Sequence, residues 1–155
     1  MTVDVRVSDT GESLDTILSL GFEAVPFAAL FYLPDDKLTL LWRNSAHAVM
    51  SGSVGADVAG MGMFEAFPPS EDAGGADAVN FIRNATEEVV RSGKPQEVGP
   101  ARFDLLSDEG HYVEHHWQMH FAPVRKDGKI IAILQTARDV TEATLSARLA
   151  QSHRR

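Results

Sequence analysis

The segment from His111 to Glu142 constrains the fold more than any other part of the chain. In residues 111–124, β-forming side chains are spread among polar ones, which favours a strand. Asp127-Gly128 is a dipeptide that supplies the positive φ angles of a two-residue hairpin turn. Residues 130–134 are apolar on both faces, as is typical of a central strand that is covered on both sides. The segment therefore predicts a hairpin whose second strand is buried.

A helix is expected to begin directly after this hairpin, in Asp139-Val140-Thr141-Glu142. Asp139 can cap the helix at its N-terminus, and Glu142, three residues on, can bond back to it. The remaining residues, 143–155, are helix-prone but too few to form a stable helix alone. We expect them to begin a linker or coiled-coil helix that leaves the domain.

Composition narrows the class of protein. A chain of 155 residues predicts one domain with a sizeable core. The net charge of −8 argues against a nucleic-acid surface, which needs a basic patch. Because no run approaches the roughly 20 apolar residues of a membrane helix, and the N-terminus has no signal pattern, we expect a cytoplasmic protein without membrane insertion. The absence of cysteine excludes disulfides, thiol catalysis and cysteine-ligated metal.

The rest of the chain predicts an α+β fold. Residues 13–20 read as a short amphipathic helix with Leu14, Ile17 and Leu18 on one face, and this face needs a partner surface. Two strands are expected next, then short helices, one long helix and a third strand, at 26–33, 38–42, 45–69, 77–92 and 96–106. With the final hairpin, this order indicates a five-stranded antiparallel sheet with helices on one face.

The motifs also resemble those of a known family. Glu114-His115-His116-Trp117-Gln118-Met119-His120-Phe121-Ala122-Pro123-Val124, a D-G turn and a strand closing in D-V-T-E are similar to the end of a PAS domain. Upstream, Met63-Phe64-Glu65-Ala66-Phe67-Pro68 resembles the F-E-x-F-P of one PAS subgroup, and Asn44 stands where such domains often cap a helix. PAS domains are small sensor modules of bacterial signalling proteins. The resemblance implies an N-terminal arm and helix at 1–21, a PAS-like sensor domain at 22–142, and the start of an output helix at 143–155.

The resemblance further implies a cavity between helices and sheet. If the turn has two residues, Lys126 pairs with Lys129, so that His120 lies opposite Gln135 and Gln118 opposite Ala137. The face that holds Gln135 would then line the cavity, and the expected ligand-binding residues are His116, Gln118, His120, Gln135 and Ile133. A three-residue turn would exchange the faces of the first strand. These polar residues could also simply satisfy one another or buried water.

The opposite face of that strand would then be apolar and exposed. Trp117, Met119 and Phe121 would coat it, and together with Leu14, Ile17 and Leu18 they form the expected dimer or partner surface. We therefore expect a homodimer. The resemblance assigns signal relay to Asp139, Thr141 and Glu142, which would pass a change in the last strand to an output domain such as a histidine kinase or diguanylate cyclase.

No cofactor is expected. His116 and His120 are about 13 Å apart on one strand face, too far for two ligands of one metal ion. Flavin-binding relatives carry a cysteine, which this chain lacks, and a glutamine where Ala137 stands. Haem-binding relatives commonly use a histidine on the long helix, and residues 77–92 contain none. An unidentified small organic ligand remains open, and the purified protein should be colourless.

Sensing and protein interaction, without enzymatic activity, is the function that these features favour. No nucleophile elbow, phosphate loop or dinucleotide fingerprint is present. Two alternatives remain: a small α+β isomerase or hydrolase that uses His116 and Glu114 as an acid–base pair, and a dimerisation module that binds no ligand.

Overall fold

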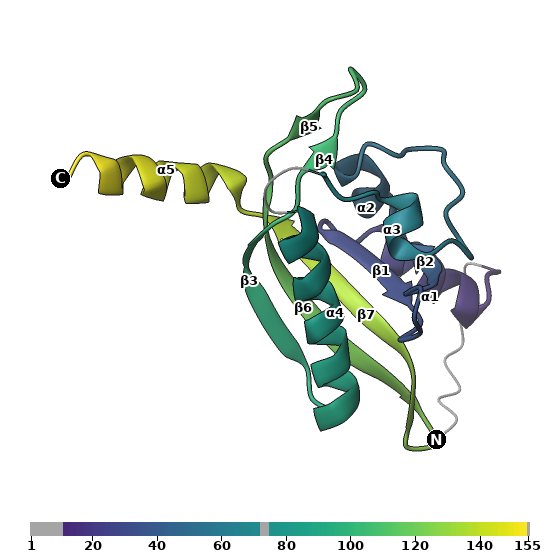
Figure 1. Ribbon diagram of the computed structural model, residues 1–155. Coiled ribbons are helices and arrows are strands. Elements are labelled where there is room, and N and C mark those ends of the chain that lie inside the picture. The colour runs from purple at the N-terminus through teal and green to yellow at the C-terminus, as the bar shows by residue number, and fades with distance from the viewer. Residues whose placement is uncertain (1–10, 72–74, 155) are drawn as a thin grey trace.

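The computed structural model describes residues 11–71 and 75–154, and within them the chain has the expected α+β architecture (Figure 1). Residues 1–10 of the expected N-terminal arm lie outside this part. A five-stranded antiparallel sheet has the order β2-β1-β7-β6-β3. Its strands are β1 (Ala28–Tyr32), β2 (Leu40–Arg43), β3 (Gln96–Arg102), β6 (His116–Lys126) and β7 (Lys129–Asp139). A separate two-stranded ladder, which the sequence does not predict, joins β4 (Leu105–Leu106) to β5 (Tyr112–Val113).

Three helices cover one face of the sheet: α2 (Ser45–Met50), α3 (Met63–Ala66) and α4 (Gly75–Ser92). The long helix α4 is the one that the sequence predicts most clearly. Asn44 caps α2 as expected, because its side-chain oxygen accepts the backbone N–H of His47 at 3.0 Å. The same buried amide accepts from Ala29 of β1 and donates to Phe27, so it ties the helix layer to the sheet.

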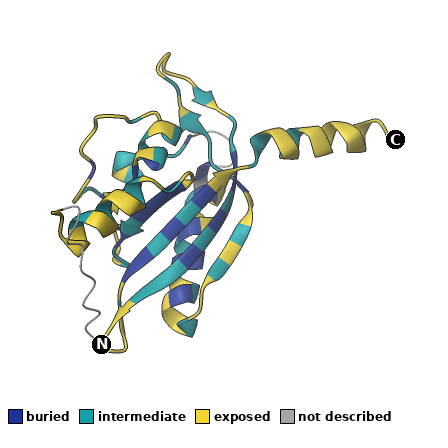
Figure 2. Cartoon of the chain, turned by 180° about the vertical axis from the view of Figure 1, so that it is seen from behind, coloured by how far each residue is buried: buried dark blue, intermediate teal, exposed yellow. Residues whose placement is uncertain are grey.

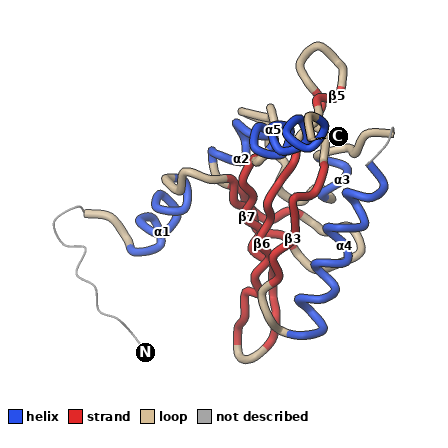
Figure 3. Tube along the Cα trace, turned by 90° about the vertical axis from the view of Figure 1, so that its left-hand side faces the viewer, coloured by secondary structure: helices blue, strands red, loops and turns tan. Residues whose placement is uncertain are grey.

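Two further helices lie away from this layer. The N-terminal helix α1 (Leu14–Glu23) lies on the opposite side of the sheet from α4, and α5 (Thr141–Ser152) extends outward from the end of β7 (Figure 3). Neither helix buries a single residue, and from behind α5 is exposed along most of its length (Figure 2). No helix in the described residues is both long and apolar enough to cross a membrane.

The β6–β7 hairpin has the predicted turn but a different register. Asp127 and Gly128 have φ angles of 52° and 79°, and Lys126 pairs with Lys129 as expected. An irregularity beside Val124 then shifts the pairing by one residue, because Ile131 is left without a partner between the pairs Arg125–Ile130 and Val124–Ala132. Such a β-bulge places one extra residue on one strand. As a result Phe121, not His120, lies opposite Gln135, and the first strand presents the reverse of the expected faces.

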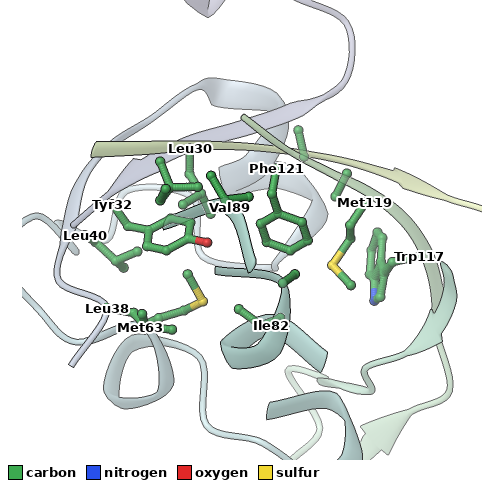
Figure 4. Packing of buried hydrophobic residues seen from close by; sticks show 14 of the residues in the cluster. Leu30, Tyr32, Leu38, Leu40, Met63, Ile82, Val89, Trp117, Met119 and Phe121 are labelled. Carbon is green, nitrogen blue, oxygen red and sulfur yellow. The ribbon is translucent and has the colours of Figure 1, made fainter. Parts of the chain in front are cut away.

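The core therefore contains the three residues that we expected on the outer face. Trp117, Met119 and Phe121 are buried beneath α4 and pack with Ile82 and Val89, as Figure 4 shows. Their expected role as a partner surface is wrong, because a one-residue shift in register moves every side chain of a strand to the other face. These large side chains fill the space in which the expected polar residues would have stood.

Candidate functional site

A small cavity lies between the helix layer and the sheet. Its volume is about 60 Å³. Its walls come from α2, α3, α4, the sheet and the segment around β4, and they are mostly apolar: Leu30, Met50, Met63, Phe64, Phe67, Ile82, Phe103, Leu105, Trp117, Met119 and Ala137. His47, Ser51 and Gln135 are the polar members of the lining. The family resemblance predicts a cavity at this position. Of its three polar residues, only Gln135 is predicted from the sequence.

Two polar atoms of this cavity have no hydrogen-bond partner within the described chain. They are Nδ1 of His47 and Oε1 of Gln135, and both residues are more than nine-tenths buried, with 7% and 8% of their surfaces exposed. The amide nitrogen of Gln135 donates only to the sulfur of Met119, at 3.4 Å. An unpaired buried polar atom costs about 1–3 kcal/mol, so each of these atoms is expected to bond to water or to another molecule.

His47 is held neutral by its surroundings. Burial lowers its pKa to about 4, and the positive charge of Arg43 contributes in the same direction. The imidazole ring also packs against Phe67 in a tilted arrangement, with ring centroids 5.2 Å apart and an interplanar angle of 57°. A neutral imidazole offers one donor and one acceptor nitrogen, so His47 can bind either kind of ligand group.

The expected ligand-binding residues divide between the two faces of the sheet. Gln135 lines the cavity, and Ile133 is fully buried on the same face. Gln118 and His120 face the other way, so their expected placement in the cavity is wrong; the bulge at Ile131 is the physical reason. Gln118 donates to Glu97 at 2.9 Å, and His120 lies 3.5 Å from the same carboxylate.

His116 also lies outside the cavity, and it does form the expected pair with Glu114. The two side chains are hydrogen-bonded at 2.5 Å. Glu114 is shared, however, because Arg148 of α5 donates to the same oxygen at 3.1 Å. The hydrogen bond from His116, and then the arginines nearby, hold the pKa of Glu114 below its usual value. A carboxylate held in this way by a histidine and cations fastens α5 to β6 and does not resemble a general acid poised near neutral pH.

The start of α5 is bonded to both strands of the hairpin. The carboxylate of Asp139 accepts the backbone N–H of Thr141 at 2.9 Å and also bonds its hydroxyl. That hydroxyl in turn accepts the backbone N–H of His116 at 2.9 Å. The helix starts one residue later than expected, with Val140 at the cap position, and Glu142 is exposed and makes no bond to Asp139 in the described chain. The capping role of Asp139 is thus present in altered form, and the expected return bond from Glu142 is wrong.

The N-terminal members of the expected partner surface are where the sequence placed them. Leu14, Ile17 and Leu18 are exposed on α1. The C-terminal end of this helix is fixed by Phe22, which packs on Phe31 and Trp42 at ring-centroid distances of 5.0 and 4.7 Å. The exposed leucines and isoleucine thus belong to a helix whose C-terminal end is anchored on the sheet.

The described residues contain no obvious set of metal ligands. In the described part of the chain, no three histidine, aspartate or glutamate side chains gather closely enough to hold an ion. His115, a neighbour in the histidine-rich strand, stacks instead on Trp117 with centroids 5.4 Å apart.

The chain matches the family model described as "PAS fold" over residues 22–145. It therefore belongs to the PAS domain family, whose members are in general sensory domains and not enzymes. No curated protein matches the sequence.

Solved structures show the same fold. An RNA-binding light-oxygen-voltage receptor has 18% identity and a TM-score of 0.62 over 99% of this chain and 42% of that one. A PAS domain from Colwellia psychrerythraea has 14% identity and a TM-score of 0.61 over 84% of this chain and 99% of that one. VqmA bound to DPO has 22% identity and a TM-score of 0.58 over 82% of this chain and 57% of that one. The chain therefore spans less than half of the light receptor.

Light-oxygen-voltage domains, one of them studied with a flavin analogue, are among these similar structures, so the fit of a flavin can be tested. Ligand pockets for molecules of that size occupy roughly 300–1,000 Å³. The cavity here is about 60 Å³, and Trp117 and Met119 occupy the space beside it. The cavity as it stands is therefore much smaller than such a pocket, and no step is assigned to a flavin.

Proposed function

We propose that this PAS domain senses a small organic molecule in the cavity between His47 and Gln135 and relays its binding through β7 to α5. The observation that carries the proposal is the pair of unpaired, buried polar atoms in an otherwise apolar cavity. Because both atoms are buried without a hydrogen bond, they destabilise the folded protein, and a ligand or an ordered water that bonds to them offsets this cost.

The chemistry of the lining defines the ligand. Oε1 of Gln135 can only accept a hydrogen bond, so the ligand must offer an O–H or N–H donor there. Apolar side chains surround this point, so the rest of the ligand is apolar. That VqmA, which shares the fold, was solved bound to DPO supports the choice of a ligand-binding function over an empty interaction module.

Binding requires the cavity to grow. About 60 Å³ has room for water, whereas an engineered cavity that holds benzene measures about 150 Å³. Met50, Met63 and Met119 line the cavity, and unbranched methionine side chains rearrange more readily than other apolar ones. The rearrangement that admits the ligand is the event to be relayed.

The relay path is short. Gln135 lies on β7 four residues before Asp139, and β7 is paired along its length with β6. Asp139 bonds Thr141, and the backbone of Val140 donates to His116 of β6 at 2.9 Å. A displacement of β7 relative to β6 would therefore strain the bonds that hold the first turn of α5. We propose that Asp139 and Thr141 relay this strain to whatever output domain or partner adjoins the helix; Glu142 has no comparable contact.

The test is native mass spectrometry of protein purified under mild conditions from cells. The wild type should carry a bound small molecule, and Gln135→Leu should lose it, because the substitution removes the acceptor from the cavity. Loss of one buried hydrogen bond weakens binding by about tenfold.

Gln118→Leu is the matched control, since Gln118 lies on the other face of the same sheet. This variant should retain the ligand. A wild-type protein without bound compound, or equal retention by both variants, would contradict the proposal.

A further inference from the structure

A second cavity adjoins the first. Its volume is about 190 Å³, and it is lined by residues of β1 and β2, by α2 and by the segment 56–59. Leu30, His47 and Phe67 line both cavities, so these three residues form the wall between them. Together the two volumes approach the roughly 300 Å³ at which ligand pockets begin.

Two of the three wall residues stand on short elements. His47 belongs to the six-residue helix α2, and Phe67 follows the four-residue helix α3. Helices of this length have little stability of their own, so their side chains are the parts of the wall that can move. Leu30 is fixed in a central strand. Separation of the His47–Phe67 ring pair would join the cavities through a narrow passage.

The second cavity contains a cation without a counter-ion. Arg43 lines it, and among the described residues no carboxylate forms an ion pair with this side chain. Its terminal nitrogens donate to the hydroxyls of Ser51 and Ser53 and to the carbonyls of Ser53 and Ala56. The guanidinium also lies 5.8 Å from the centroid of the Phe67 ring, directly beside the wall.

The remaining charged residue of this cavity does not neutralise Arg43. Asp57 is exposed, and its carboxylate accepts the backbone N–H of Ala59 at 3.2 Å. Arg43 is half-buried and held by neutral acceptors only. These bonds use the four N–H groups of the terminal nitrogens, so the remaining Nε–H and the uncompensated positive charge are what would attract a ligand carboxylate.

We infer that the two cavities are chambers of one site, and that its ligand is an elongated organic acid with a hydroxyl or N–H group at its far end. This inference rests on the proposed function and specifies its ligand. The carboxylate lies at Arg43, the chain passes between His47 and Phe67, and the donor reaches Oε1 of Gln135. A slender aliphatic chain suits the passage better than a ring system does.

The experiment uses three probes of one length: hexanoate with a hydroxyl on its terminal carbon, plain hexanoate, and the terminal diol of hexane. The fluorescence of Trp117, which lines the first cavity, reports arrival there. The chain has two tryptophans, and Trp42 lines the second cavity, so the titrations are run in both the wild type and Trp42→Phe, and only an emission change seen in both is assigned to Trp117.

The hydroxy acid should bind most tightly. It should exceed hexanoate by about 3- to 10-fold, because only it donates to Gln135. It should exceed the diol by about tenfold, because only an acid makes charge-assisted bonds to Arg43. Arg43→Gln should abolish the preference for the hydroxy acid over the diol and leave its preference over hexanoate. Gln135→Leu should abolish the preference over hexanoate and leave the preference over the diol.

Arg43 also holds the loop after α2 through its bonds, so a second variant tests the second cavity with Arg43 left in place. This variant is Ala59→Leu. It narrows the second cavity and should therefore weaken the binding of both acids. If the diol shifts Trp117 emission and the hydroxy acid binds no better, the proposed function stands and the joined site is wrong. If Arg43→Gln bound the hydroxy acid as tightly as the wild type does, the joined site would also be wrong. If no probe shifts the emission, the inference fails, and the native mass measurement decides the proposed function separately.

Discussion

At the scale of single residues, the buried side chain of His47 leads to a prediction about the pH dependence of stability. Its pKa is lowered from 6.5 to about 4 by burial, so the unfolded chain binds a proton at pH values where the folded protein does not. Stability therefore rises with pH between these two values. The contribution is fully present above the unfolded pKa and is lost as the pH falls toward about 4, on the order of 3 kcal/mol in total.

Urea unfolding of the wild type and of His47→Gln at a series of pH values checks this prediction. The difference in unfolding free energy between the two proteins should change across this window and stay constant above it. His111→Gln is the control, since His111 is exposed and its side chain has only a distant carboxylate at 4.0 Å. If the two variants showed the same pH profile, His47 would not be the titrating group.

The sequence predicted Gln135 as a cavity residue but not His47. No local pattern marks His47, because Ser45-Ala46-His47-Ala48 reads as an ordinary helix start after a capping asparagine. Its importance arises from packing against Phe67, twenty residues away, and from enclosure by the sheet. The sequence does not indicate Arg43 either, because a charged residue at a strand end is normally solvated. Only the tertiary fold places Arg43 beside a cavity.

At the scale of elements, hydrophobic pattern and turn chemistry predicted the strands of the main sheet along the chain but not their register. The D-G turn and the pair Lys126–Lys129 follow from sequence. The bulge at Ile131 does not, because the apolar run around it suits either face. The burial of Trp117 and Phe121 decides the register, since leaving two large aromatic side chains in water costs several kcal/mol. The cavity side of β6 could thus not be assigned from the strand itself.

The junction between β7 and α5 gives a prediction at this scale. Asp139→Ala removes the carboxylate that accepts the Thr141 N–H and lies at the positive end of the helix dipole, so the first turn of α5 should lose about 0.5–2 kcal/mol. Because β7 is a central, buried strand, it should keep its own stability. Hydrogen exchange should therefore quicken in residues 142–150 and remain slow in residues 130–138.

Glu142→Ala is the matched control for this junction, since the exposed side chain of Glu142 makes no bond to Asp139 in the described chain. It removes a first-turn negative charge but no hydrogen bond to the cap, so it should quicken exchange in the helix less than Asp139→Ala does. Equal exchange in the two variants would show that Asp139 does not hold the helix, and the proposed relay would lose its physical basis.

At the scale of the whole molecule, the two helices that lie away from the core carry exposed apolar side chains. The helix α1 exposes Leu14, Ile17, Leu18 and Leu20, while α5 exposes Leu149. Each helix has at most twelve residues and buries none of them, although isolated helices shorter than about 12–15 residues are only marginally stable in water. A stable α1 and α5 therefore both call for further packing beyond this single chain.

A second copy of the chain is the partner that we predict. The expectation of a homodimer no longer rests on Trp117, Met119 and Phe121, which are core residues, and now rests on the apolar face of α1. A two-fold axis would bring two such faces together. Phe22 packs against the sheet and Glu23 accepts a hydrogen bond from Ser45 of α2, so the C-terminal end of α1 is held and its face is presented in a fixed direction.

Leu18→Asp should convert the protein to monomer, because it places a charge in the middle of this face, where Leu18 is 62% exposed in the single chain. Sedimentation velocity at micromolar concentrations measures the outcome. Val54→Asp is the control: Val54 is similarly exposed, at 72%, but lies in the loop between α2 and α3. The control should remain dimeric. A wild type that sediments only as monomer would rule out self-association through α1, and a Leu18→Asp variant that stays dimeric would place the interface on another surface, with the exposed helix α5 as the next to be tested.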